Sequence, residues 1–539
     1  MQPQGRASIE QLSNKNGVTA LLIGAYSLLD GVGSGNIGRQ STISNYVFGG
    51  ISSGDAVKGT DAGDQPEQSF IEQYNWVADN SYFLGKWQHA YDGVARCNEV
   101  IQIVTSKAVV DMTDFEKNQV IAEARFLRGH YHFEAKKMWN KVPYIDEATT
   151  AYTNAEDIWP KIEADFKFAY DNLPETQDLQ AKANKWAAAC YLAKTYMYEK
   201  KFTEAKALYD IITVSGKTAN GSKYGLQDAY WKCFDANFEN TGEEVFGISM
   251  AASGTVDQSG ETSMGLAFPY GGDFGCCGFF QPSQNLVNSY KTSADGLPLF
   301  TTFNDVDLKN DQGLKDVDAY TNDLVTPLDP RLDWSVGRRG VPYWDWGPHP
   351  GYSWIRDQSY AGPFSPKKHV FSKKDETTLT SSGWKNITAK DIYLIRYSDV
   401  LLMAAEAEIE VGSLATAQSY INQVRARAKN PASWVQGAPA NYVINTYTVP
   451  FASLDEARTA VRFERRLELA MEGHRFFDLV RWGIAAETLN AYLLKEKVKR
   501  TYKSTASFTK GKNEYFPIPA SIIDIAAKYG NTLTQNPNY

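Results

Sequence analysis

The sequence contains few of the residues that cross-link small domains or bind metal ions. Its 539 residues include five cysteines and six histidines. The cysteines form no CxxC pair and the histidines no HExxH pattern. The sequence is therefore not a disulfide scaffold, its spacings are not those of a zinc site, and we favour a structural role for the histidines. We expect no cofactor. Only the acidic run Asp305, Asp307 and Asp311 suggests Ca²⁺, and it lacks the glycine and glutamate of an EF-hand loop. Adjacent Cys276 and Cys277 are either two loop thiols, which we favour, or a vicinal disulfide.

Long apolar runs and an excess of positive charge are also missing. The most apolar run, Val18–Leu29, has 12 residues, whereas a membrane-spanning helix needs about 20. Lys and Arg number 55 against 63 Asp and Glu, so the net charge is −8. This balance argues against a nucleic-acid partner and against electrostatic docking on an anionic membrane surface.

Helical periodicity dominates the first 215 residues. Apolar stripes predict helices near residues 18–29, 87–101 and 158–173. The pattern Thr113-x-x-Glu116 predicts a capping box that opens a long helix ending before Pro143. Asn98 lies on a buried stripe and therefore requires a hydrogen-bond partner.

A helical hairpin is predicted over residues 184–199 and 203–213, and its spacing recurs 212 residues later. Ala193 and Ala205 of the first hairpin correspond to Ala405 and Ala417 of the second, where small side chains permit close helix packing. The pattern resembles the tetratricopeptide helix pair. We therefore predict a mainly α fold, with tetratricopeptide-like pairs in an α-α superhelix.

Residues 222–390 are rich in Gly, Pro, Asp and aromatics and show little helical periodicity. They predict a long loop-rich insertion with a few short strands, such as Glu244–Ile248, and helices are expected to resume at Ile392. The expected regions are a helical N-terminal region (1–221), the insertion as candidate ligand face (222–390) and a helical C-terminal region (391–539). We expect the C-terminal region to form one compact fold with the first.

Patterns associated with catalysis occur without the structural context they need. Gly33–Gly38 matches GxGxxG and Gly50–Gly54 matches GxSxG, but neither follows a predicted strand. The charged segment near the C-terminus contains the spacings Arg465/Glu468, Arg475/Asp478 and Asp478/Arg481, which predict local ion pairs with a structural role. We predict no catalytic residue.

Aromatic residues gather in the insertion between residues 268 and 364, and Tyr343–Pro348 places two tryptophans two positions apart. Flat aromatic rings cover the apolar faces of sugars, and tryptophan and tyrosine add a polar group. In an extended loop, Trp344 and Trp346 are expected to project to one side. The candidate ligand-binding residues here are Tyr270, Tyr343, Trp344, Trp346, Trp354 and Arg338. A second set, in the loop before the helix near residue 87, includes Trp76 and Tyr82.

Three segments carry a resemblance to one family. They are Glu123–Arg128 running on to Trp139–Pro143, Tyr393–Ala407, and Glu464–Trp482 with its motif EGHRFFDLVRW. They resemble the SusD/RagB family of Bacteroidetes, and the resemblance covers nearly the whole chain.

The resemblance implies a non-catalytic, glycan-binding lipoprotein on the extracellular face of the outer membrane. It also implies a partner, a TonB-dependent SusC-like transporter that receives the oligosaccharide, and a glycan site built from the loop around Trp76 and the insertion together. The membrane is then contacted only through an N-terminal lipid anchor, whose signal peptide and cysteine are not in this chain. The alternatives are a helical glycoside hydrolase, since the sequence does not fix the separation of its carboxylates, and a peptide-binding repeat scaffold.

Overall fold

The computed structural model describes residues 9–32, 40–106, 108–252, 264–380 and 385–539. Contacts divide the chain into two compact units. Unit 1 comprises Met1–Ile43, Val77–Lys223 and Tyr515–Tyr539, and unit 2 comprises Ser44–Trp76 and Tyr224–Glu514. Residues 391–514 therefore share a unit with most of the predicted insertion. Within the described ranges, no helix is both long enough and apolar enough to cross a membrane.

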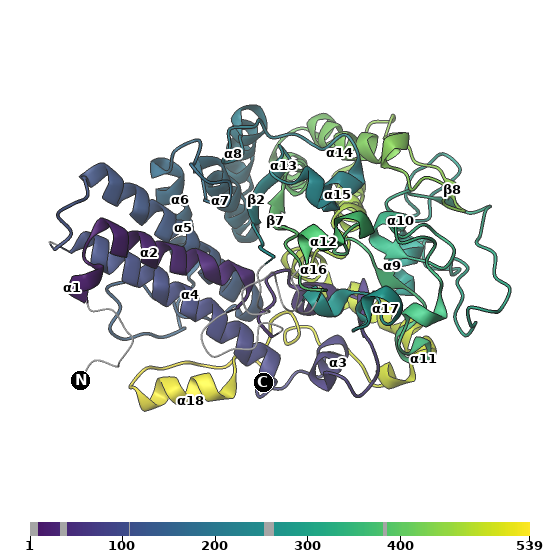
Figure 1. The fold of residues 1–539 in the computed structure, drawn as a ribbon, viewed down its shortest axis with the longest axis horizontal. Coiled ribbons are helices and arrows are strands. Elements are labelled where there is room, and N and C mark those ends of the chain that lie inside the picture. The colour runs from purple at the N-terminus through teal and green to yellow at the C-terminus, as the bar shows by residue number, and fades with distance from the viewer. Residues whose placement is uncertain (1–8, 33–39, 107, 253–263, 381–384) are drawn as a thin grey trace. The chain divides into compact units, whose positions relative to one another are not determined.

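Unit 1 is built from helices that mostly pack against their neighbours in the sequence (Figure 1). The predicted capping box is present, because Thr113 and Glu116 each accept a hydrogen bond from the other's backbone N–H. The amide of Asn98 donates to the carbonyl of Ile145 and accepts from Arg128, so its buried position is satisfied. The helices are α1 (Ile9–Leu12), α2 (Lys15–Ser27), α4 (Ser81–Thr105), α5 (Asp114–Trp139), α6 (Trp159–Asn172), α7 (Lys185–Glu199), α8 (Phe202–Ser215) and α18 (Ala520–Lys528).

Each unit contains one of the predicted helix pairs. In unit 1 the pair is α7 and α8, and in unit 2 it is α13 (Tyr397–Val411) and α14 (Leu414–Lys429). The alanines expected at the contacts, Ala193, Ala205, Ala405 and Ala417, are all fully buried. The prediction of a mainly helical chain with tetratricopeptide-like pairs and few short strands is confirmed.

Unit 2 adds short strands, and every sheet in the described residues has two of them. The predicted strand Glu244–Ile248 is β2, which pairs antiparallel with β7 (Ile392–Arg396). The expectation of a helix from Ile392 was wrong by five residues, because β-branched and aromatic side chains of β7 pair with β2 before α13 begins. The other pairs are β1 (Ala56–Gly59) with β3 (Phe279–Pro282), β4 (Pro327–Leu328) with β8 (Asn441–Tyr442), and β5 (Val336–Gly337) with β6 (Ser365–Pro366).

Short helices interrupt the loops of unit 2, and longer ones follow towards its end. The unit's remaining helices are α3 (Pro66–Glu72), α9 (Gln284–Ser289), α10 (Leu332–Ser335), α11 (Gln358–Ala361), α12 (Glu376–Leu379), α15 (Leu454–Glu468), α16 (Arg475–Arg481) and α17 (Ala485–Lys499). In Figure 1, α13, α14 and α15 lie beside one another, in agreement with their contacts.

A buried ion network surrounds the last residue of α15. The carboxylate of Glu468 binds Arg331, Arg396 and Arg427, and all four side chains are at most 3% exposed. Burial alone would raise the pKa of Glu468, but the guanidinium groups outweigh burial and hold that pKa well below its usual range. The three arginines come from the insertion, from the end of β7 and from α14, so one carboxylate joins three distant segments.

The local pairs predicted for the charged segment form in one case of three. Asp478 pairs with Arg481 at 2.8 Å, as expected. Glu468 binds the distant arginines instead of Arg465, which pairs with Asp478 at 3.0 Å. The predicted Arg475–Asp478 pair is absent from the described structure, because Asp478 is already bound by two other arginines.

Substituting Glu468→Gln leaves three buried arginines without their shared anion. We expect the free energy of unfolding to fall by about 3–5 kcal/mol, as for a broken buried ion pair. Denaturant titration measures this loss. The matched control is Asp455→Asn in the same helix, where the side chain is 92% exposed and we expect a change within about 1 kcal/mol. Equal losses in the two variants would contradict the role of the network.

The ion pairs of Glu472 lead us to expect that the free energy of unfolding falls in acid. Burial opposes its ionisation, but Arg396 and Lys368 lower its pKa from 4.5 to about 2. Between pH 4.5 and about 2, Glu472 is protonated in the unfolded chain but still ionised in the folded protein. Its contribution to stability is therefore fully present above pH 4.5 and is lost as the pH falls towards 2. Urea titrations across this window are expected to show a shallower loss for Glu472→Gln than for the unmodified protein. The same slope in both proteins would show that Glu472 contributes nothing.

Candidate functional site

A pocket of about 480 Å³ in unit 2 is lined by four tryptophans, which we call the tryptophan pocket: Trp231, Trp334, Trp344 and Trp434. They come from the 3-10 helix η5 (Tyr230–Phe234), from α10, from the loop after β5, and from the residue after the 3-10 helix η12 (Pro431–Ser433). All four rings are half-buried. Trp231 and Trp334 are stacked with centroids 6.0 Å apart, and Trp334 and Trp344 are 5.1 Å apart.

All four indole N–H groups of the tryptophan pocket donate to backbone carbonyls. Trp231 donates to Ala432 at 3.0 Å and Trp334 to Ser433 at 2.7 Å. The other two indoles donate to the carbonyls of Lys367 at 3.2 Å and Ala428 at 3.3 Å. These bonds fix the rings before any ligand arrives, so binding would cost little side-chain entropy.

Two of the rings are tied to Glu468 through residues close to them in sequence. The hydroxyl of Tyr230, next to Trp231, donates to the carbonyl of Glu468 at 3.0 Å. Arg331, which binds the carboxylate of Glu468, lies three residues before Trp334. The residues bonded to Glu468 therefore also position this side of the pocket.

The other two rings are connected to the same glutamate. Lys368 donates to its carbonyl at 3.1 Å, and the neighbouring Lys367 carbonyl receives the indole N–H of Trp344. Arg427 binds its carboxylate, and the carbonyl of the next residue receives the indole N–H of Trp434. All four pocket tryptophans are thus connected to one buried residue, two through the carboxylate of Glu468 and two through its backbone carbonyl.

Polar groups surround the rings. Asp235, Asp345, Ser372, Lys374 and Gln436 also line the pocket. The carboxylate of Asp345 accepts from the backbone N–H groups of Lys373 at 2.5 Å and Lys374 at 3.0 Å. The pocket has the size of a small-molecule site, with apolar walls and a few polar groups. Rings that cover apolar C–H faces and polar groups that bond hydroxyls suit a sugar.

Of the predicted site residues, only Trp344 lines this pocket, and several are buried. Tyr343 is fully buried and donates its hydroxyl to Pro366. Trp76 donates its indole N–H to Ile71 at 2.8 Å, and Arg338 pairs with Asp333 at 2.7 Å. Trp354 is 8% exposed, and Tyr82 is buried in α4 of unit 1. The structure gives these five side chains packing roles, because their surfaces are already covered.

Tyr270 and Trp346 are half-buried but do not line the tryptophan pocket. The guanidinium of Arg356 lies 5.4 Å from the Tyr270 ring centroid. The indole N–H of Trp346 donates to Phe371 at 2.9 Å. Trp344 has φ 49°, so the chain turns there and the expectation of an extended segment was wrong.

The sequence-based prediction missed three of the four pocket rings. Trp231, Trp334 and Trp434 lie in separate segments without helical periodicity. A single sequence holds no signal that pairs them, because their proximity depends on the long-range bonds of Glu468. The one available signal was the abundance of aromatic residues in segments without helical periodicity.

The other sequence candidates have structural partners. Asp305 lies 3.5 Å from Lys495, Asp307 pairs with Lys499 at 2.7 Å, and burial raises the pKa of Asp311 to about 6. Within the described ranges, no cluster of three or more acidic, histidine or cysteine residues is arranged to hold a metal ion. Cys276 and Cys277 form a disulfide, so the favoured interpretation as free thiols was wrong. The Gly50–Gly54 motif forms the end of a π-helix and a 3-10 turn, and Gly33–Gly38 lies outside the described residues.

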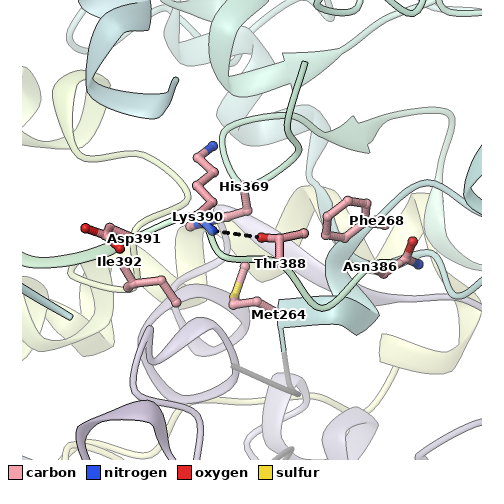
Figure 2. Close-up of a pocket in the computed structure, with 8 residues that line it drawn as sticks. All are labelled: Met264, Phe268, His369, Asn386, Thr388, Lys390, Asp391 and Ile392. Atoms are coloured by element: carbon pink, nitrogen blue, oxygen red, sulfur yellow. Dashed lines mark hydrogen bonds between the residues drawn. The ribbon is translucent and has the colours of Figure 1, made fainter. Parts of the chain in front are cut away.

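A second, smaller pocket is shown in Figure 2. Its volume is about 30 Å³, which suits a water molecule rather than a sugar. His369 and Lys390 line it, and burial lowers their pKa values to about 4 and about 8. The lining residues are Met264, Phe268, His369, Asn386, Thr388, Lys390, Asp391 and Ile392.

Comparison with known proteins defines the class. Residues 38–197 match a family described as starch-binding proteins associating with the outer membrane, so the chain is of a SusD-like class associated with that membrane. Residues 242–539, more than half of the chain, match the SusD family itself. The chain therefore belongs to the SusD family, as its motifs predicted. Glycan-binding proteins of this family are non-catalytic, which confirms the expectation that the chain is not an enzyme.

Individual relatives match nearly the whole chain at low identity. SusD-like protein P2 of Formosa agariphila is 23% identical over 506 residues, which are 90% of this chain and 86% of that protein. Surface glycan-binding protein A from Bacteroides thetaiotaomicron, solved with laminarihexaose, superposes with a TM-score of 0.70 at 21% identity, over 98% of this chain and 100% of the other. A laminarin-binding SusD-like protein has a TM-score of 0.63 at 22% identity, over 98% and 100%.

The backbone of Trp344 generates a prediction. Its φ of 49° is strained for a residue with a Cβ. We expect Trp344→Gly to be more stable than Trp344→Ala by about 1 kcal/mol, because both lose the ring but only glycine relieves the strain. Trp334, in the helix α10, is the matched control, where the alanine variant should be the more stable of the two. Thermal unfolding of the four variants tests this, and the same order at both sites would contradict it.

Proposed function

We propose that this SusD-family protein captures oligosaccharides in the tryptophan pocket without cleaving them. The single observation that carries the proposal is the set of four half-buried rings, each fixed by its indole N–H, in a pocket of about 480 Å³. Fixed aromatic faces bind sugars without chemistry, since no group has to move or exchange a proton.

We propose further that the captured oligosaccharide passes to a TonB-dependent SusC-like transporter, with the protein lipid-anchored at the extracellular face of the outer membrane. Family membership and the match to outer-membrane starch-binding proteins support this placement. Laminarin and laminarihexaose are the first ligands to test, because two structural relatives are described with them.

Native affinity electrophoresis against laminarin, starch and other soluble polysaccharides, with a reducing-end assay beside each gel, tests the proposal. We expect retardation by at least one polysaccharide and no new reducing ends. Trp434→Ala should weaken binding about tenfold or more, as truncation of a central tryptophan does at other interfaces.

Trp346→Ala is the matched control, since this ring is also half-buried and hydrogen-bonded but does not line the pocket. It should bind like the unmodified protein. New reducing ends would identify a hydrolase. Binding lost in Trp346→Ala but kept in Trp434→Ala would move the site to the rings predicted from the sequence.

A further inference from the structure

A third pocket, of about 380 Å³, lies in unit 2 and shares no lining residue with the tryptophan pocket. Its walls include Phe300, Phe303 and Phe463, and the ring centroid of Phe463 lies 5.4 Å from that of Phe300 and 5.6 Å from that of Phe303. Two guanidinium groups, of Arg466 and Arg475, line the same pocket. The pocket therefore combines apolar walls with positive charge.

The two arginines differ in their partners. Arg466 is bound by Asp55 at 2.7 Å and by the amide oxygen of Asn285 at 2.6 Å. Arg475 lies 5.8 Å from the ring of Trp482, and no carboxylate in the described part of the chain pairs with it. The carboxylate three residues along the helix, Asp478, is occupied by other arginines.

An unpaired guanidinium in this position is costly. Burial and the nearby charge of Arg466 lower the pKa of Arg475 to about 10, so the group remains charged at neutral pH. Lys495 lines the pocket as well, and its charge faces Asp305 at 3.5 Å. Asp55 and Asp478 lie close enough to oppose this lowering of the Arg475 pKa, but both carboxylates are already paired with other arginines. Within the described residues Arg475 therefore has no ion-pair partner of its own, and an entering anion would supply one.

We propose that this pocket binds a small carboxylate carried on a six-membered ring, with Arg475 on the carboxylate and the phenylalanines against the face of the ring. Guanidinium groups bind carboxylates in a bidentate way, and the volume admits one such ring. A sugar acid and an aromatic acid share this chemistry. The site is independent of the tryptophan pocket and of what binds there.

Calorimetric titration with D-glucuronate, benzoate and glucose as probes tests the proposal on the full chain. We expect glucuronate, benzoate or both to bind, with glucose at least tenfold weaker than the acid. Glucuronate alone would assign the site to sugar acids, and benzoate alone to aromatic acids. Raising the salt should weaken binding, since the contact is between charges.

Two variants place the site. Arg475→Met removes the charge, and Ala491→Leu places a larger side chain on the pocket wall formed by α17 while leaving every charge in place. Each should weaken binding of the acid at least tenfold, and the second decides the question if the first does not fold. Arg339→Met, outside the pocket, is the matched control and should bind normally. Trp434→Ala should also bind the acid normally, which separates this site from the proposed glycan site.

Three results would overturn the proposal. They are no binding of either acid, equal binding of glucose and glucuronate, or acid binding that survives in both Arg475→Met and Ala491→Leu.

Discussion

The bond between the Glu468 carboxylate and three buried arginines is the constraint on which unit 2 depends. Arg331, Arg396 and Arg427 come from segments that share no secondary-structure element. In the described part of the loop-rich region, every sheet has only two strands, so the sheets hold few segments together. A charged hub is a costly way to join segments, because each ion must leave water. In return, the hydrogen bonds are directional, because a carboxylate that accepts from three guanidinium groups permits few arrangements of the segments that carry them.

The contacts of Glu468 also position the candidate site. Each tryptophan of the pocket is within a few residues of a group bonded to Glu468, or bonds to the backbone beside one. A glycan-binding surface on loops would otherwise lose affinity by ordering its rings at each binding event. The rings here are already held by their N–H groups, so contact with a sugar is the remaining step. This is consistent with a family whose glycan-binding members carry out no catalysis.

The helical part of the fold was predictable because its signals are local. The capping box of Thr113, the small alanines of the helix pairs and the strand Glu244–Ile248 follow from neighbouring residues. The site was not, because aromatic residues in loops serve the core as readily as a ligand. Tyr343 and Trp354 fill the core beneath the loops, while Trp434, which lies outside the predicted insertion, faces the pocket. Distinguishing them requires the contacts of Arg331 and Arg427, which are 137 and 41 residues from Glu468.

The most direct test is a crystal structure of the protein with a bound oligosaccharide, taken from a polysaccharide that retards it. The account predicts a pyranose ring within about 4 Å of the tryptophan rings of the pocket, with those rings unmoved from their carbonyl partners. An oligosaccharide seated on Tyr270 and Trp346, with the tryptophan pocket empty, would contradict it.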